Sequence, residues 1–183
     1  MRASPPDAPS AVALLREGAW RFDGSRILQQ AAVRCARRGF TGGAAWMALA
    51  LSELRGSALS PPRAGAVRLG VIKYGVSALA ATIVVGIAFA AGHALLLPLA
   101  VVAFYVVEAA GAFVFPAFAD GSARPWAESR RLVFAAGGLG VVASRMFVVA
   151  LVMVLGGFSG RGFLRSWCIG CLTVALWYER LRR

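Results

Sequence analysis

Two cysteines three residues apart, Cys168 and Cys171, are the side chains of this sequence whose spacing most directly suggests chemistry. They stand in "RSWCIGC", at the predicted start of the last apolar helix, with Arg165 one turn before them. A helix N-terminus and a nearby guanidinium both lower the pKa of a thiol, so this arrangement favours a reactive thiolate. The competing interpretation is two small apolar side chains packed on a helix.

Glu108 and Arg145 are the next candidates, because each interrupts a long apolar segment. An ionisable side chain inside a membrane is costly, so it is expected to be paired or to face a polar pathway. With about 1.5 Å of rise per residue, their predicted depths differ by roughly 7–8 Å, most of which an arginine side chain covers. We therefore predict an ion pair between Glu108 and Arg145. The pair would either fix the register of two helices or mark a proton or ligand pathway.

His93 is the single histidine of the chain and follows Gly92 in a predicted turn. It is a weak candidate for cofactor binding, as a ligand of haem or a pigment, and the alternative is a polar turn residue. Two closely spaced cysteines and one histidine fall short of the four ligands of a structural zinc site, so no metal centre is expected. The sequence leaves the identity of any cofactor open. It also contains no P-loop, nucleophile elbow, HExxH or dinucleotide-binding motif.

The elements that would position these residues follow from the composition. The chain has 183 residues, of which 59% are hydrophobic and 15% charged, against roughly 45–50% and about 25% in a typical soluble domain. A soluble fold of this size lacks the interior to bury so much apolar surface. The sequence therefore predicts an all-α, polytopic integral membrane protein.

Four transmembrane helices are predicted, at about 69–92, 94–115, 132–157 and 163–180. The last is marginal because Arg165 leaves only a short uncharged stretch, so three spans is the alternative. Small residues recur every four positions in the first span and again in the third, a pattern that lets helices approach closely in lipid. These residues are Ala78, Thr82, Gly86 and Ala90, with Ala136 and Gly140.

Residues 1–68 are predicted to form a separate basic region, and residues 69–183 the membrane bundle. Residues 1–10 suggest a loose tail, and the Pro- and Gly-rich segment 55–68 a boundary loop. Between them, a helix with an apolar and an arginine-rich face should begin after Ser25 and end near Gly39. Such amphipathic helices lie in the membrane interface, or alternatively pack on a partner.

The charge balance predicts the orientation. There are 20 Lys and Arg against 8 Asp and Glu, and the four-span topology places most of the basic residues on the side of both termini. By the positive-inside rule, both termini should be cytoplasmic, with the chain integral to the cell (inner) membrane. The expected partners are membrane lipids and other membrane protein subunits. No nucleic acid is expected, since no nucleic-acid recognition motif is present.

The function that fits these features best is a small, non-catalytic accessory or assembly subunit of a larger, possibly bioenergetic, membrane complex. The alternative is a membrane enzyme acting on a lipid, isoprenoid-type or quinone substrate, with Glu108 and Arg145 or the Cys168–Cys171 thiol pair as the working groups. A small transporter module is a further alternative. The sequence leaves open whether the protein is an enzyme.

Overall fold

The computed structural model describes residues 9–57 and 64–183, and this part of the chain is helical without strands. The predicted tail and boundary loop lie partly outside the described residues, at positions 1–8 and 58–63. The α-helices, in chain order, are α1 (Ala11–Gly24), α2 (Arg26–Ala36), α3 (Gly39–Arg55), α4 (Ala66–Ala90), α5 (Leu97–Ala110), α6 (Val114–Ala119), α7 (Pro125–Ala135), α8 (Leu139–Gly156) and α9 (Phe163–Arg182). Short helical turns, η1 (Ala94–Leu96) and η2 (Gly157–Arg161), precede α5 and follow α8.

Three described helical segments are long and apolar enough to cross a membrane: Ala66–Ala90, Ala94–Ala119 and Leu139–Gly160. They correspond to the first three predicted spans, so the prediction of a helical protein with membrane-spanning segments is confirmed at this level. The fourth predicted span is not among them. It forms α9, which is mostly buried in the protein between Ser166 and Tyr178 and whose C-terminal end carries charged side chains.

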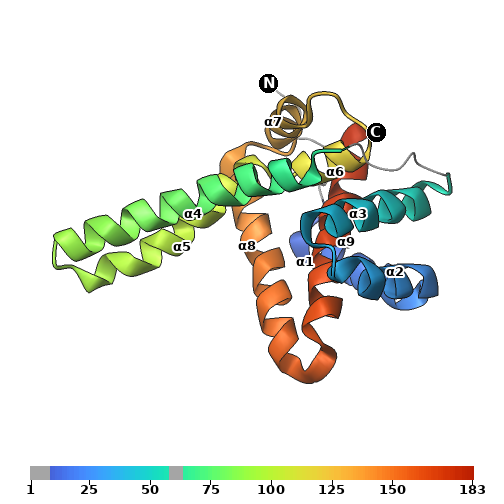
Figure 1. Cartoon of the computed structure of the whole chain (residues 1–183), viewed down its shortest axis with the longest axis horizontal. Coiled ribbons are helices and arrows are strands. Elements are labelled where there is room, and N and C mark those ends of the chain that lie inside the picture. The colour runs from blue at the N-terminus through green and yellow to red at the C-terminus, as the bar shows by residue number, and fades with distance from the viewer. Residues whose placement is uncertain (1–8, 58–63) are drawn as a thin grey trace.

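Helices α4 and α5 form a long hairpin that extends away from the other helices (Figure 1). The predicted turn at Gly92 is confirmed, because this glycine has a φ of 68°, a conformation that glycine adopts without steric cost. Pro98 lies in the first turn of α5, where its missing N–H removes no helical hydrogen bond. Apart from their mutual contacts, the two helices meet the rest of the protein only near the base of the hairpin (Figure 1).

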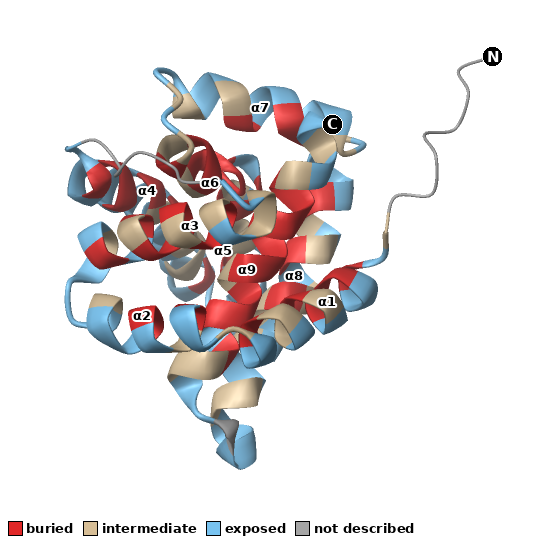
Figure 2. Cartoon of the chain, turned by 90° about the vertical axis from the view of Figure 1, so that its right-hand side faces the viewer, coloured by how far each residue is buried: buried red, intermediate tan, exposed pale blue. Residues whose placement is uncertain are grey.

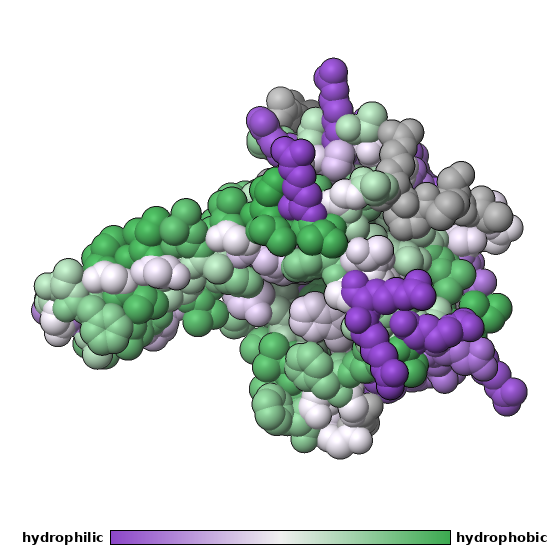
Figure 3. Space-filling view, viewed as in Figure 1, coloured by the Kyte–Doolittle hydropathy of each residue, from purple (hydrophilic) through white to green (hydrophobic). Residues whose placement is uncertain are grey.

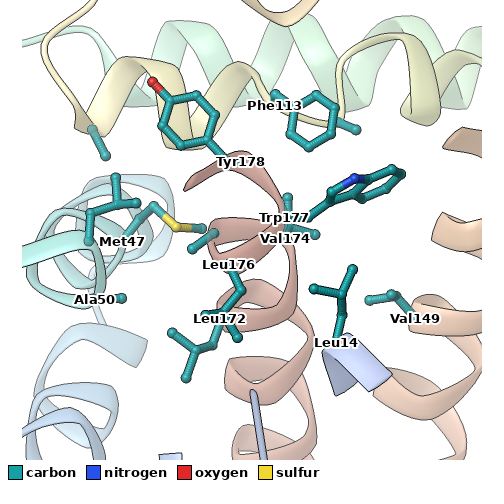
Figure 4. Close-up of a cluster of buried hydrophobic side chains, with 14 of the residues drawn as sticks. Leu14, Met47, Ala50, Phe113, Val149, Leu172, Val174, Leu176, Trp177 and Tyr178 are labelled. Atoms are coloured by element: carbon teal, nitrogen blue, oxygen red, sulfur yellow. The ribbon is translucent and has the colours of Figure 1, made fainter. Parts of the chain in front are cut away.

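Helix α9 lies at the centre of the remaining helices and packs on α1, α2, α3, α7 and α8. Its side chains Leu172, Trp177 and Tyr178 are almost fully buried, and the ring of Trp177 meets that of Phe113 edge-on at 5.1 Å (Figure 4). In Figure 2 much of α9 has the colour of buried residues, and the helices around it carry more exposed positions. The N-terminal helices and the C-terminal helix therefore share one hydrophobic core.

The arginine-rich helix predicted after Ser25 is α2. The Ser25 hydroxyl accepts a hydrogen bond from the N–H of Leu28 at 3.2 Å, which confirms the predicted cap. The helix ends at Ala36, three residues before the predicted stop. Its apolar side chains Leu28, Ala31 and Ala32 are buried against the protein core. This contact matches the alternative of packing on a partner, and the predicted interfacial placement is not confirmed.

The predicted third span begins too early. Residues 132–135 belong to α7, and the chain then turns through Gly137 and Gly138, which have φ values of 104° and 92°. Helix α8 starts only at Leu139. Consecutive left-handed conformations cannot continue an α-helix, so the apolar run is divided although its composition is uniform. The segment 116–131, between the second and third predicted spans, contains most of α6 and α7.

Candidate functional site

The two buried charges of the hairpin pair with each other. Lys73 of α4 and Glu108 of α5 form an ion pair of 2.6 Å between Nζ and Oε1, and 5% and 9% of these side chains are exposed. The predicted partner of Glu108 was Arg145 of α8, and this prediction is wrong for the structure. The antiparallel hairpin brings the lysine of α4 to the same level as the glutamate of α5. Lys73 is held in this pair at the base of the hairpin.

Two aromatic rings lie over the Lys73 ammonium group, and a third ring stacks on both of them. Phe40 stacks on Tyr74 and on Phe115, with ring centroids 5.7 and 6.2 Å apart. The Nζ atom lies 5.2 Å from the Tyr74 centroid and 5.5 Å from that of Phe115, which is within the range of cation–π attraction. A carboxylate and two ring faces thus compensate a lysine that is shielded from solvent. The sequence signal for this environment was the single lysine in an otherwise apolar helix.

Glycines make this packing possible at two places. A Cβ atom on Gly70 would lie 2.4 Å from the Phe40 ring, and one on Gly111 would lie 3.3 Å from Cε of Lys73. Any larger residue at position 70 would displace Phe40 from its stack on Tyr74. The absence of side chains at these two glycines is therefore part of how the Lys73 environment is built.

Glu108 nevertheless keeps one unsatisfied atom. Its Oε2 is buried and accepts no hydrogen bond from any residue that the structure describes. A buried carboxylate oxygen without a donor costs free energy unless the group is protonated or a ligand or water supplies the donor. A hydrogen-bonding guest is therefore chemically expected at Glu108.

Arg145 lies where α8 packs on α9, and not at the Lys73–Glu108 pair. Its guanidinium carbon lies 5.1 Å from the centroid of the Trp177 ring. The Nη1 atom is buried and has no hydrogen-bond acceptor among the described residues. Sequence reasoning found the residue as an outlier but assigned it the wrong neighbour, because the position of α9 beside α8 depends on the tertiary fold.

Cys168 and Cys171 are free thiols on the core side of α9. Helix α9 begins at Phe163, so Cys168 is already in its second turn, where the field of the helix terminus has weakened. Burial raises the pKa of Cys168 to about 12, and the neighbouring Cys171 adds to this effect. Burial also raises the pKa of Cys171 to about 12, although the charge of Lys73 acts in the opposite direction. Both thiols are therefore protonated at neutral pH, unlike the reactive thiolate considered from the sequence.

His93 lies at the far end of the hairpin and is exposed. Within residues 9–57 and 64–183, no three His, Cys, Asp or Glu side chains are grouped so that they could hold a metal ion. The structure brings together Lys73 and Glu108, and it separates His93 from them by the length of α4 and α5 (Figure 1).

A polar network that the sequence did not predict joins three distant segments. Asp120, after α6, accepts hydrogen bonds from Arg55 of α3 at 2.5 Å and from the hydroxyl of Tyr178 of α9 at 2.8 Å. Arg182 also pairs with Asp120, and Glu179 binds Arg55 at 2.5 Å. These residues lie up to 127 positions apart in the chain, so no local pattern reveals them. The network marks the polar end of α9.

Comparison with known proteins identifies no relative: no family model, no curated protein and no solved structure matches this chain.

Proposed function

We propose that this chain is a non-catalytic accessory or assembly subunit of a larger membrane complex. In this proposal, the α4–α5 hairpin crosses the cell (inner) membrane and both termini lie on the cytoplasmic side. The observation that carries the proposal is the apolar surface of the hairpin, which has no partner among the described residues beyond its base. Large side chains such as Leu79, Ile83 and Phe89 are 59%, 54% and 74% exposed.

The small residues of α4 lie on this exposed surface. Ala78, Thr82, Gly86 and Ala90 are all exposed, although such a face normally serves close packing between helices. A Cβ atom added to Gly86 would meet no atom within 4 Å. The α4–α5 contact uses other residues of α4, including Ser77 and Ala88. The small-residue face is therefore available to a helix of another subunit.

The environments of the candidate catalytic residues also support a non-catalytic role. Lys73 and Glu108 neutralise each other, and the thiols of Cys168 and Cys171 have raised pKa values. A protonated thiol is a poor nucleophile, and a carboxylate paired with an ammonium group is a weaker base. These environments do not favour an enzyme mechanism based on these residues.

The distribution of charge supports the proposed orientation. Residues 74–107 contain no Lys, Arg, Asp or Glu. The hydrophilic side chains visible in Figure 3 gather on the helices beyond the base of the hairpin, whereas the hairpin itself is mostly hydrophobic. A basic region next to an uncharged hairpin is the pattern that keeps basic segments in the cytoplasm.

The test is the native mass of the complex after extraction in mild detergent. We expect the wild-type chain of 19.2 kDa to be held in a larger assembly at a fixed stoichiometry. The double variant Ala78→Leu/Gly86→Leu should lose the partner while keeping its helical content, because bulk on the small-residue face prevents close approach. A matched control, Val76→Leu/Val101→Leu, adds bulk where large side chains are already exposed and should retain the assembly. The proposal would be contradicted if the wild-type chain is monomeric, or if both double variants lose the partner to the same extent.

A second candidate function is an enzyme that binds a lipid-like or quinone substrate, and the unsatisfied Oε2 of Glu108 favours it. A quinol or alcohol hydroxyl would donate the missing hydrogen bond. Organic extraction of the purified chain, followed by mass spectrometry, would then recover a bound small molecule at stoichiometric amounts. Glu108→Gln should reduce this amount, whereas a subunit without a substrate would yield only bulk lipid.

A further inference from the structure

Arg145 presents a different problem from Glu108. A buried carboxyl can lose its charge by binding a proton, but a guanidinium stays protonated under all ordinary conditions. The Nη1 atom of Arg145 is buried, and no carboxylate within residues 9–57 and 64–183 pairs with it. The Trp177 ring compensates only part of the cost of removing this charge from water. An acceptor from outside the described chain is therefore expected.

The position of the guanidinium group relative to the polar residues of α9 indicates the chemical class of that acceptor. Trp177 directly precedes Tyr178 and Glu179, which belong to the polar network of Asp120 and Arg55. Arg145 thus lies beside the polar end of α9, close to the start of α8. Helical side chains also point towards the helix N-terminus, which here is the end nearer to that polar region. In a membrane-embedded chain, lipid phosphates meet helices at their polar ends, whereas a carboxylate in the middle of a partner helix would lie deeper.

The start of α8 is open to a headgroup. Cβ atoms built on Gly138 and Gly140 would meet no atom within 4 Å. On either side of this opening, Phe134 and Leu139 are 73% and 40% exposed, so apolar side chains are available to acyl chains. An open backbone flanked by exposed apolar side chains suits a molecule with a polar head and apolar tails.

We propose that Arg145, held against Trp177, binds the phosphate group of an anionic phospholipid at the start of α8. The guanidinium donates charge-assisted hydrogen bonds to the phosphate oxygens, and the indole face fixes its orientation. The lipid supplies the missing negative charge. This inference needs only the membrane location of the chain, so it stands or falls independently of the accessory-subunit proposal.

The test measures retained lipid by native mass spectrometry of the full chain. The chain is purified in nonionic detergent and equilibrated with equal amounts of phosphatidylglycerol and phosphatidylcholine. We expect the wild type to retain one phosphatidylglycerol preferentially, because the phosphate of phosphatidylcholine is already neutralised by its own choline. Arg145→Met should weaken this retention about tenfold or more, as expected for the loss of a charge-assisted hydrogen bond. Arg145→Lys keeps the charge and should retain the preference with lower affinity.

Arg16→Met is the matched control, because Arg16 is an exposed arginine of α1 and its loss changes the net charge equally. It should bind lipid as the wild type does. Millimolar inorganic phosphate should leave the lipid bound, and its displacement would identify the free ion as the ligand and overturn the lipid assignment. The proposal also fails if the wild type shows no preference for phosphatidylglycerol, or if Arg145→Met retains as much as Arg16→Met. The wild-type measurement decides the question even if the Arg145 variants do not fold.

Discussion

Lys73 and Glu108 form a 2.6 Å ion pair across the α4–α5 hairpin, and less than a tenth of either side chain is exposed. Burying two charges costs several kcal/mol each in idealised terms, and their attraction offsets this cost only when the geometry is good. The pair is therefore weak evidence for added stability. Its clearer consequence is that any slip of α4 along α5 would separate the two charges in apolar surroundings, so the pair fixes the register of the hairpin.

Removal of one partner of the Lys73–Glu108 pair should lower the free energy of unfolding more than removal of both partners. Lys73→Met or Glu108→Gln leaves an uncompensated buried group and should destabilise the protein by about 3–5 kcal/mol. The double variant Lys73→Met/Glu108→Gln should recover a large part of this loss. Thermal unfolding in detergent, followed by circular dichroism, measures the three variants.

The control is a second cycle that combines Glu108→Gln with Arg145→Met. Because the structure pairs Glu108 with Lys73, these two changes should add within about 0.5 kcal/mol, as independent sites do. Strong coupling between Glu108 and Arg145, with none between Glu108 and Lys73, would restore the pairing that was predicted from the sequence.

The thiols of Cys168 and Cys171 should react slowly with alkylating agents at neutral pH. Their raised pKa values of about 12 keep the nucleophilic thiolate scarce until the pH is well above 9. In a Cys35→Ser background, iodoacetamide labelling at pH 8 should be much slower for the folded chain than for the chain denatured in SDS. Equal rates in the two states would show that the thiols are reactive after all.

The same pKa values predict how stability depends on pH. The thiols of the unfolded chain lose protons near their ordinary pKa of 9, whereas those of the folded chain hold them to about 12. The stabilising contribution is therefore complete below pH 9 and is lost as the pH rises from about 9 to 12. Cys168→Ala/Cys171→Ala should flatten this alkaline decline in the unfolding midpoint.

Two glycines of α4 should respond in opposite ways to alanine. Gly70→Ala places a Cβ atom 2.4 Å from the Phe40 ring and should cost about 1–3 kcal/mol through overpacking. Gly75→Ala, five residues later, meets no atom within 4 Å and should be neutral or stabilise the helix by about 0.5–1 kcal/mol. The midpoints of thermal unfolding compare the two variants directly. Similar midpoints would show that Phe40 does not pack on Gly70.

The local elements followed closely from the sequence where local chemistry determines them. The cap at Ser25 and the turn at Gly92 depend on a few neighbouring residues, and both predictions are confirmed. The break at Gly137 and Gly138 was missed because apolar composition alone does not reveal a left-handed backbone. The candidate residues were likewise recognisable as outliers, but their partners were not.

The sequence by itself determined that this is a helical protein with segments able to cross a membrane, because apolar content and segment length act independently of the rest of the fold. Only the tertiary structure decided which charges meet. Glu108 pairs with Lys73 because a tight turn makes α4 and α5 antiparallel neighbours, and Arg145 stacks on Trp177 because α9 is buried beside α8. Two buried charges offset their desolvation cost only where packing brings them into contact, so the identity of a partner depends on a tertiary arrangement that no linear spacing specifies.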